Sequence, residues 1–245
     1  MKIAGIIPAR YESTRLPGKP LLLIKGKPMI QRVYEQAMKS RLINSVIVAT
    51  DDKRIFDCVK RFGGEVMMTS SKHTSGTDRV SEAARKFKPD LIVNIQGDEP
   101  YIHPGNIDKA IYPFLKDKNL EVTTLAIRIK TLADITDENK VKVVLDKNNY
   151  ALYFSRNYIP FDMKNNPAQL WSLNGNKYYK HIGIYVYRKD FLKKFCRLKK
   201  SYLEKTEMLE QLRILENGDK IKVVLTSKDS LSIDTKSDLE QINKL

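Results

Sequence analysis

Three cations lie close together near the N-terminus. Arg10, Arg15 and Lys19 follow an apolar run that ends at Pro8, and Glu12 is the one acid among them. A strand that opens into a basic turn is a natural phosphate site, because backbone N–H groups and fixed cations meet an anion there. The segment matches neither the Walker pattern nor the Gly-x-Gly-x-x-Gly dinucleotide pattern. We therefore expect a phosphate cradle built more from Arg and Lys than from Gly.

Two aspartates follow apolar segments, where a carboxylate can hold a metal ion. Asp98 comes after the apolar run 91–95, and Asp234 lies between Ile233 and the end of the chain. Oxygen ligands suit Mg²⁺, which often holds triphosphates through one or two carboxylates and several waters. Glu99 is the weaker candidate, because its side chain should point away from that of Asp98. Each aspartate has an alternative role as the cap of the helix that follows it.

The overall charge favours anionic partners. Lys and Arg number 44 against 29 Asp and Glu, which gives a net charge of +15 in 245 residues. Nucleic acids, nucleotides and acidic sugars all fit such a surplus, although much of the lysine is expected on the solvated surface. The chain has no RNA-recognition aromatic motif, zinc knuckle or helix-turn-helix pattern, so we expect no nucleic-acid partner. The hydrophobic content of 42% favours a folded domain over a disordered chain.

The cysteines and the N-terminus indicate a cellular compartment. Cys58 and Cys196 belong to no Cys-x-x-Cys pair and have apolar neighbours. We expect buried, inert thiols and neither a zinc site nor a disulfide framework. The apolar run before Pro8 is too short for a signal peptide or a membrane span. These features predict a cytoplasmic protein with no membrane partner.

Strand-like and helix-like segments alternate through the first half of the chain. The expected strands are 2–7, 45–49, 65–68 and 91–95, and the expected helices are 28–40, 52–62 and 77–87. This order predicts an α/β fold with a doubly wound, mostly parallel sheet and helices on both faces. Ligands of such sheets bind beyond the carboxyl ends of the strands. The basic turn and Asp98 both fall at that edge.

The second half has a different pattern. Strand-like segments at 122–129, 142–145, 151–154 and 181–187 surround a polar stretch from 162 to 178. We expect a small antiparallel flap subregion at about 150–190 within a single domain spanning 1–245. A helix over 204–216 (with Met208 and Leu212 toward the core), a strand over 221–225 and a closing helix over 235–245 complete the prediction.

The candidate residues lie within longer motifs. They read PAR-x4-RLPGKPL at 8–21, GKPMI at 26–30, ATD at 49–51, HTSGTDR at 73–79, NIQGDEP at 94–100, VKVV at 141–144, YALYFSR at 150–156, HIGIY at 181–185, EMLEQLR at 207–213 and IDT at 233–235. Together they resemble the sugar-acid cytidylyltransferase family, and within it the branch that activates 3-deoxy-manno-octulosonate (Kdo). The resemblance covers nearly the whole chain, apart from the polar stretch at 163–176.

The resemblance implies a reaction. CTP and Kdo would form CMP-Kdo and diphosphate with the help of Mg²⁺, which activates Kdo for lipopolysaccharide biosynthesis. Other ulosonic acids, such as 8-amino-Kdo or a sialic acid, remain alternative acceptors, because one or two pocket residues are enough to change that preference. The resemblance also implies a fold of the nucleotide-diphospho-sugar transferase type. A homodimer through the middle strands and the flap is a further implication.

The resemblance assigns catalytic roles to the residues introduced above. Arg10, Arg15 and Lys19 would neutralise the β- and γ-phosphates, so that diphosphate leaves more readily. Asp98 and Asp234 would hold the Mg²⁺ ion. The remaining nucleotide-binding residues would be Pro8, Ala9, Ser75, Gly76, Thr77, Arg79, Gln96 and Gly97.

A pocket for the sugar acid is also implied. Its expected members are Gln96, Arg156, His181, Tyr185, Glu210 and Gln211. Arg156 would bind the substrate carboxylate in a bidentate manner. Without the resemblance, His181 is predicted to be a structural histidine, and Glu210 and Gln211 are predicted to be solvated helix positions.

Overall fold

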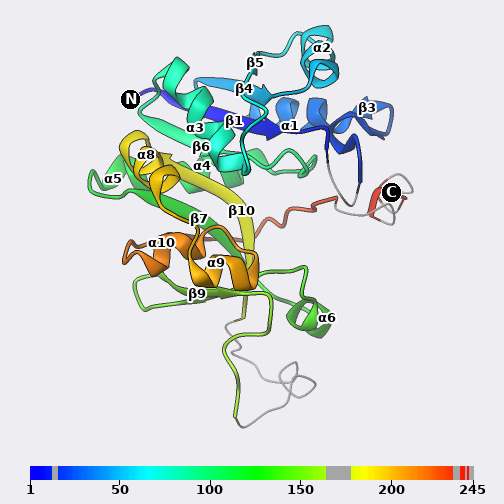
Figure 1. The fold of residues 1–245 in the computed structure, drawn as a ribbon. Helices are drawn as coiled ribbons and strands as arrows, with labels where there is room; N and C mark the ends of the chain where they lie inside the picture. Colours follow the sequence, from blue (N-terminus) through cyan, green and yellow to red (C-terminus); the bar gives the residue numbers. More distant parts are fainter. Residues whose placement is uncertain (13–15, 164–177, 234–237, 241, 243–245) are drawn as a thin grey trace.

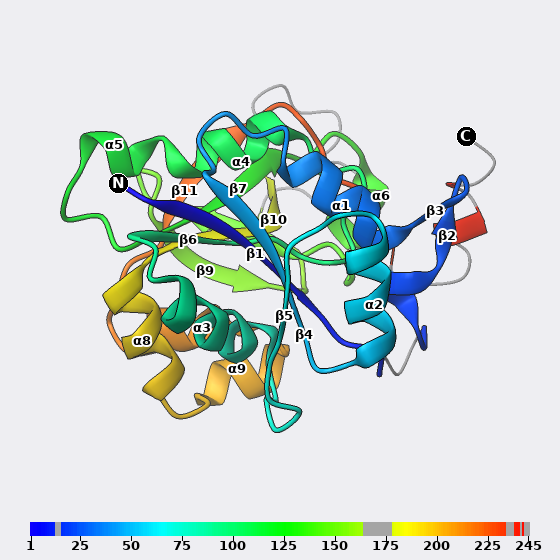
Figure 2. The same cartoon turned by 90° about the horizontal axis from the view of Figure 1, so that it is seen from above.

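A nine-stranded sheet runs through the middle of the molecule (Figures 1 and 2). The computed structural model describes residues 1–12, 16–163, 178–233, 238–240 and 242. The main path of the sheet has the order β11-β7-β10-β6-β1-β4-β5. These strands are β1 (Ile3–Ala9), β4 (Ser45–Thr50), β5 (Val66–Met68), β6 (Leu91–Asn94), β7 (Val122–Arg128), β10 (Tyr179–Arg188) and β11 (Lys222–Thr226).

Most pairings along this path are parallel. Strand β1 pairs in parallel with β4 and β6, as β4 does with β5 and β11 with β7. Strand β10 runs antiparallel to β6 and β7, and β8 (Lys142–Leu145) and β9 (Ala151–Ser155) continue from it as an antiparallel pair. A separate hairpin joins β2 (Leu23–Ile24) to β3 (Lys27–Pro28). The mostly parallel sheet with a small antiparallel part confirms the predicted fold class.

Helices cover both faces of the sheet (Figure 2). One face carries α1 (Met29–Ala37), α2 (Lys53–Arg61), α4 (Pro104–Ile111) and α5 (Pro113–Lys116), and the other carries α3 (Gly76–Phe87), α8 (Lys189–Arg197), α9 (Tyr202–Glu207) and α10 (Leu212–Glu216). Strand β1 explains the arrangement, because its side chains alternate between the two faces. Ile3 and Ile7 pack with the first group, whereas Ala4 and Ile6 pack with the second.

Local signals in the sequence account for several helix ends. The side chain of Asp52 caps α2 by accepting a hydrogen bond from the Arg54 backbone N–H at 2.9 Å. Gly63, with φ of 78°, follows the end of the same helix.

Cys58 is buried and Cys196 is half-buried, and both are free thiols. Burial raises the pKa of Cys196 to about 12, so this thiol stays protonated, in line with the expected inert thiols.

The helix predicted over 204–216 is wrong as a single element. It breaks at Met208, whose φ of 54° ends α9, and α10 starts only at Leu212. Met208 is 75% exposed, so its predicted core position is wrong as well. Leu209 and Leu212 are both buried beside this turn. The same turn carries Glu210 and Gln211.

Two predicted segments fall largely outside the described residues. They are the polar stretch, of which 164–177 is not described, and the closing helix over 235–245. A short helix, α6 (Leu132–Thr136), precedes β8. Within the described parts of the chain, no helix has both the length and the apolar character needed to span a membrane.

Candidate active site

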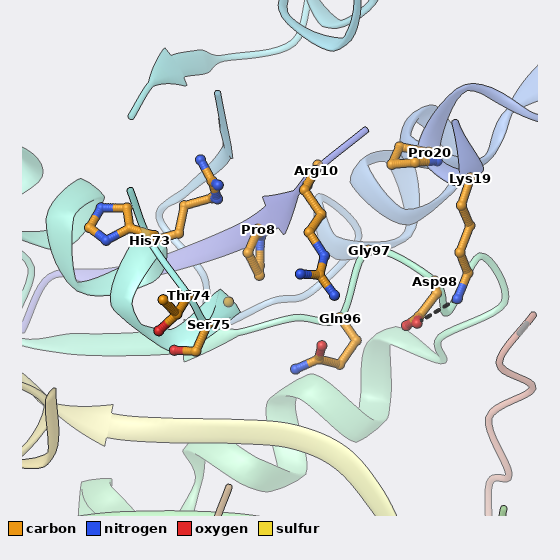
Figure 3. A pocket seen from close by; sticks show the side chains of 13 residues that line it. Pro8, Arg10, Lys19, Pro20, His73, Thr74, Ser75, Gln96, Gly97 and Asp98 are labelled. Carbon is orange, nitrogen blue, oxygen red and sulfur yellow. Dashed lines mark hydrogen bonds and ion pairs between the residues drawn. The ribbon is translucent and has the colours of Figure 1, made fainter. Parts of the chain in front are cut away.

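A cavity of about 260 Å³ opens at the carboxyl ends of β1 and β6 (Figure 3). Its walls are formed by Pro8, Ala9, Arg10, Lys19, Pro20, His73, Thr74, Ser75, Gly76, Arg79, Gln96, Gly97 and Asp98. The described residues predicted to bind the nucleotide thus line one cavity, with the exception of Thr77, which is buried in α3. Arg15 and Asp234 lie outside the described residues. We call this space the nucleotide cavity.

One predicted phosphate-binding cation contacts the predicted metal ligand. The Lys19 ammonium lies 2.8 Å from Oδ2 of Asp98 (Figure 3). Lys19 belongs to the short 3-10 helix η1 (Lys19–Leu21), and Asp98 belongs to the turn after β6. Asp98 does not cap α4, because His103 takes that position. The pair therefore places a cation and a carboxylate side by side at the rim of the cavity.

Helix α3 begins at this cavity. Ser75 caps it by accepting a hydrogen bond from the Asp78 backbone N–H at 3.1 Å. The first helical residue, Gly76, is exposed, and a Cβ there would meet the Pro8 ring at 3.4 Å. The positive end of the helix dipole thus faces the cavity, which favours a bound anion.

Arg79 differs from the other cations of the cavity. It is only 4% exposed, and its guanidinium donates to Asp51 at 2.7 Å and to the Thr69 hydroxyl. Its charge is therefore already compensated by protein groups. Arg10, in contrast, is exposed, and in Figure 3 its guanidinium extends over the cavity toward Gln96.

Gly97 has a steric role at the floor of the cavity. A Cβ at this position would lie 3.0 Å from the backbone oxygen of Pro8. The ends of β1 and β6 can therefore approach each other only because residue 97 has no side chain. This close approach brings Arg10 and Asp98 to the same opening.

A second cavity, of about 210 Å³, adjoins the first and shares Gln96 with it. It is lined by Asn94, Gln96, Val141, His181, Gly183, Tyr185, Tyr187, Leu209, Glu210 and Gln211. Five of the six residues predicted to bind a sugar acid are therefore brought together. We call this space the acceptor cavity.

Burial shifts the pKa of two groups in the acceptor cavity. Burial lowers the pKa of His181 to about 3, so its ring is neutral at pH 7. The ring lies against Phe154 and Tyr185, and its Nε2 is 2.9 Å from the Thr124 hydroxyl. Burial also raises the pKa of Glu210, which accepts a hydrogen bond from the Thr77 hydroxyl. These groups suit a ligand that offers several hydroxyls.

Arg156, the sixth predicted member, does not line the acceptor cavity. Its Nε donates to the Glu207 carbonyl at 2.9 Å, and its Nη1 donates to the Glu138 carbonyl at 3.2 Å. Helix α9 ends at Glu207, and its last carbonyls need partners outside the helix. Arg156 thus ties the end of α9, just before the turn that carries Glu210, to the loop that precedes β8.

Sequence reasoning missed Asn94 as a cavity residue. It is 2% exposed, and its Nδ2 donates to the Thr77 hydroxyl at 3.4 Å. A signal was present, because Asn94 is the one polar residue in the buried run 91–95. His73 and Thr74 also line the nucleotide cavity, and both belong to the HTSGTDR motif, whose later residues are predicted to bind the nucleotide.

Asp98 is the predicted metal ligand that lies among the described residues. Among the described residues, no three His, Cys, Asp or Glu side chains are grouped as metal ligands. Asp98 provides carboxylate oxygens at the rim of the nucleotide cavity. The backbone N–H of Ile233 donates to the Asp98 carbonyl at 3.0 Å, so the described chain comes next to Asp98 one residue before Asp234.

Comparisons with known proteins agree with this geometry. A family model described as "Cytidylyltransferase" matches residues 4–221. The 3-deoxy-manno-octulosonate cytidylyltransferase of Geotalea daltonii is 51% identical over 99% of this chain and 97% of its own. The enzyme of the same name from Thermodesulfovibrio yellowstonii is 53% identical over 98% of this chain and 96% of its own.

Solved structures show the same likeness. A CMP:2-keto-3-deoxy-manno-octonic acid synthetase complexed with CTP superposes with a TM-score of 0.92 at 41% identity, covering 100% of this chain and 98% of its own. A 4-diphosphocytidyl-2C-methyl-D-erythritol synthase from Anaerococcus prevotii has a TM-score of 0.63 at 14% identity, over 99% of this chain and 95% of its own, and shares the fold alone.

Proposed function

Because this chain belongs to the cytidylyltransferase family and is a nucleotidyltransferase, we propose that its substrates are CTP and Kdo. The products are CMP-Kdo and diphosphate, and the reaction supplies activated Kdo for lipopolysaccharide biosynthesis. One observation carries the proposal: Gln96 lies in the wall between two adjoining cavities. One cavity has cations for a triphosphate, and the other has the neutral His181 ring and other polar groups for a sugar. The two substrates therefore meet beside Gln96.

The transfer is a displacement at the α-phosphorus of CTP. The anomeric hydroxyl of Kdo forms the new P–O bond and gives up its proton, while the bond to the β-phosphate breaks and diphosphate leaves. Arg10 and Lys19 neutralise the negative charge that builds up on the leaving group. We assign the same role to Arg15, which precedes Lys19 in the same basic segment. The protein accelerates the step mainly by position and charge.

Mg²⁺ fits the donor set that this chain offers. Asp98 presents hard oxygen ligands beside the phosphate-binding cations, and we assign the second carboxylate to Asp234. The bond from Ile233 to the Asp98 carbonyl supports this assignment, because successive Cα atoms are only about 3.8 Å apart. When bound, Mg²⁺ supplies positive charge to the phosphate oxygens.

The acceptor is tested by measuring diphosphate release with CTP and a panel of acids. Kdo, 8-amino-Kdo and a sialic acid form the informative set, because they differ in the groups that the acceptor cavity would contact. We expect Kdo to give the highest kcat/KM. Release with another ulosonic acid and none with Kdo would overturn the acceptor assignment but leave the cytidylyl chemistry in place.

Arg156→Ala is expected to raise the KM for the sugar acid at least about tenfold and to leave the KM for CTP nearly unchanged. The resemblance predicts a direct contact with the substrate carboxylate. The structure offers an indirect route to the same result, because Arg156 holds the carbonyl of Glu207 next to the turn that carries Glu210. Steady-state kinetics with each substrate varied separately give the measurement. An unchanged sugar KM would remove Arg156 from the acceptor site.

We propose further that the enzyme works in the cytoplasm, where CTP is made, as a homodimer without nucleic-acid or membrane partners. Exposed apolar side chains support the dimer, since Leu152 in β9 and Phe161 are 61% and 65% exposed. Both lie in the region from about 150 to 190 that is predicted to form the contact. Sedimentation at micromolar concentration distinguishes a dimer from a monomer.

A further inference from the structure

The loop 69–75, which joins the short strand β5 to α3, forms one wall of the nucleotide cavity. We call it the cavity loop. Its last three residues, His73, Thr74 and Ser75, line the cavity and lie next to one another in Figure 3. The three residues before them, 70–72, are all exposed. A segment with so little buried surface gains little from packing, so side-chain contacts must hold it in place.

The carboxylate of Glu82, on α3, holds the cavity loop at two points. Its Oε2 accepts a hydrogen bond from the Ser70 backbone N–H at 3.0 Å and another from Nε2 of His73. The Ser70 N–H and the His73 ring hold the pKa of Glu82 below its ordinary value, so the carboxylate is charged at pH 7. Hydrogen bonds to a charged acceptor are among the strong ones. One oxygen atom therefore ties both ends of the stretch 70–73 to the helix.

Arg79 adds contacts at the start of the same loop. Its guanidinium donates to the Thr69 hydroxyl at 2.5 Å and lies 3.5 Å from the Ser70 carbonyl. Residues three apart in a helix share one face, so Arg79 and Glu82 form a row along α3. This row fastens the cavity loop to the helix whose first turn opens at the nucleotide cavity.

We propose that Glu82 is a positioning residue for the nucleotide. By holding Ser70 and His73, it keeps the cavity loop against α3, so that Thr74 and Ser75 form the wall of the nucleotide cavity. The role rests on the proposed function, in which the nucleotide is CTP. Glu82 is not among the residues that line the cavity, and its negative charge by itself disfavours a bound triphosphate. Its contribution to CTP binding therefore comes through the loop.

Three variants separate the positioning role from charge and from stability. Glu82→Ala removes both hydrogen bonds, whereas Glu82→Gln removes the charge and keeps an oxygen that can accept them. Glu35→Ala is the matched control, because Glu35 is also a helical glutamate, pairs with Lys27 at 2.9 Å and does not line the cavity. Calorimetry without Kdo gives the dissociation constant of CTP. Hydrogen–deuterium exchange of the amides in 69–75, steady-state kinetics with each substrate varied and the unfolding midpoint complete the set.

We expect Glu82→Ala to speed exchange in the cavity loop and to raise the dissociation constant and the KM of CTP about fivefold or more, with kcat and the sugar KM little changed. Glu82→Gln and Glu35→Ala should stay near the wild type throughout. An unchanged CTP affinity in Glu82→Ala overturns the proposal, as does a fall in kcat and in the unfolding midpoint without a change in the CTP KM. An equal loss in Glu82→Gln also overturns it, because the effect would then come from charge.

A failure of the proposed function has a different signature. A wild type that binds CTP but releases no diphosphate with any ulosonic acid overturns the proposed acceptor and leaves the role of Glu82 standing. A wild type that binds no CTP overturns both.

Discussion

Asp98→Asn is expected to lower kcat by about 10²–10³-fold or more, which corresponds to about 3–4 kcal/mol of transition-state stabilisation. Asparagine has nearly the same shape as aspartate but lacks the charge that a divalent cation requires. Asp234→Asn should have an effect of similar size, because each carboxylate is proposed to supply part of one metal site. Removal of Mg²⁺ by a chelator should abolish turnover in the wild type.

The measurement must distinguish a loss of catalytic activity from a loss of the folded structure. Asp98 is one-third exposed and forms an ion pair with Lys19, so the asparagine variant should keep the fold, as judged by its unfolding midpoint. Asp190→Asn is the matched control, because Asp190 is 90% exposed and lies in α8, away from both cavities. This control should leave kcat unchanged. Near wild-type turnover by both site variants would refute the metal assignment.

The layout of the sheet could be predicted because strand-like and helix-like segments alternate regularly along the first half of the chain. Runs such as 91–93 are apolar on both sides, as is typical of a central parallel strand. Parallel strands also fix where their carboxyl ends meet, so the basic turn and Asp98 could be assigned to one edge before any coordinates. The nucleotide cavity lies at that edge.

Other features have no comparable signal. Residues 204–216 are good helix formers throughout, and nothing in their periodicity indicates that Met208 turns the chain into a left-handed conformation. A long-range contact decides the matter, because the Arg213 guanidinium meets the Glu204 carboxylate, which a continuous helix would hold far apart along its axis. Arg156 is a similar case. Its partners are the backbone carbonyls of Glu207 and Glu138. Every residue has a backbone carbonyl, so the sequence does not indicate which carbonyls Arg156 contacts.

The broken helix depends on a buried ion pair. Arg213 of α10 donates to the Glu204 carboxylate of α9 through Nε at 2.7 Å and Nη2 at 2.6 Å. The two residues are 5% and 7% exposed. Glu204 also completes the capping box of α9 with Ser201. The pair therefore fixes the angle between the two short helices and, with it, the turn that carries Glu210 and Gln211 into the acceptor cavity.

Glu204→Ala is expected to lower the free energy of unfolding by about 3–5 kcal/mol, because it leaves the Arg213 charge buried and uncompensated. Urea unfolding followed by circular dichroism gives this value. The double variant Glu204→Met/Arg213→Met should recover most of the stability, since apolar side chains of similar volume fill the same space without the desolvation cost. The exposed pair of Lys193 and Asp190 is the contrast, and Asp190→Ala should change stability far less. If Glu204→Ala cost no more than Asp190→Ala, the ion pair would not be what holds the turn, and the acceptor cavity would owe its shape to the packing of Leu209 and Leu212 alone.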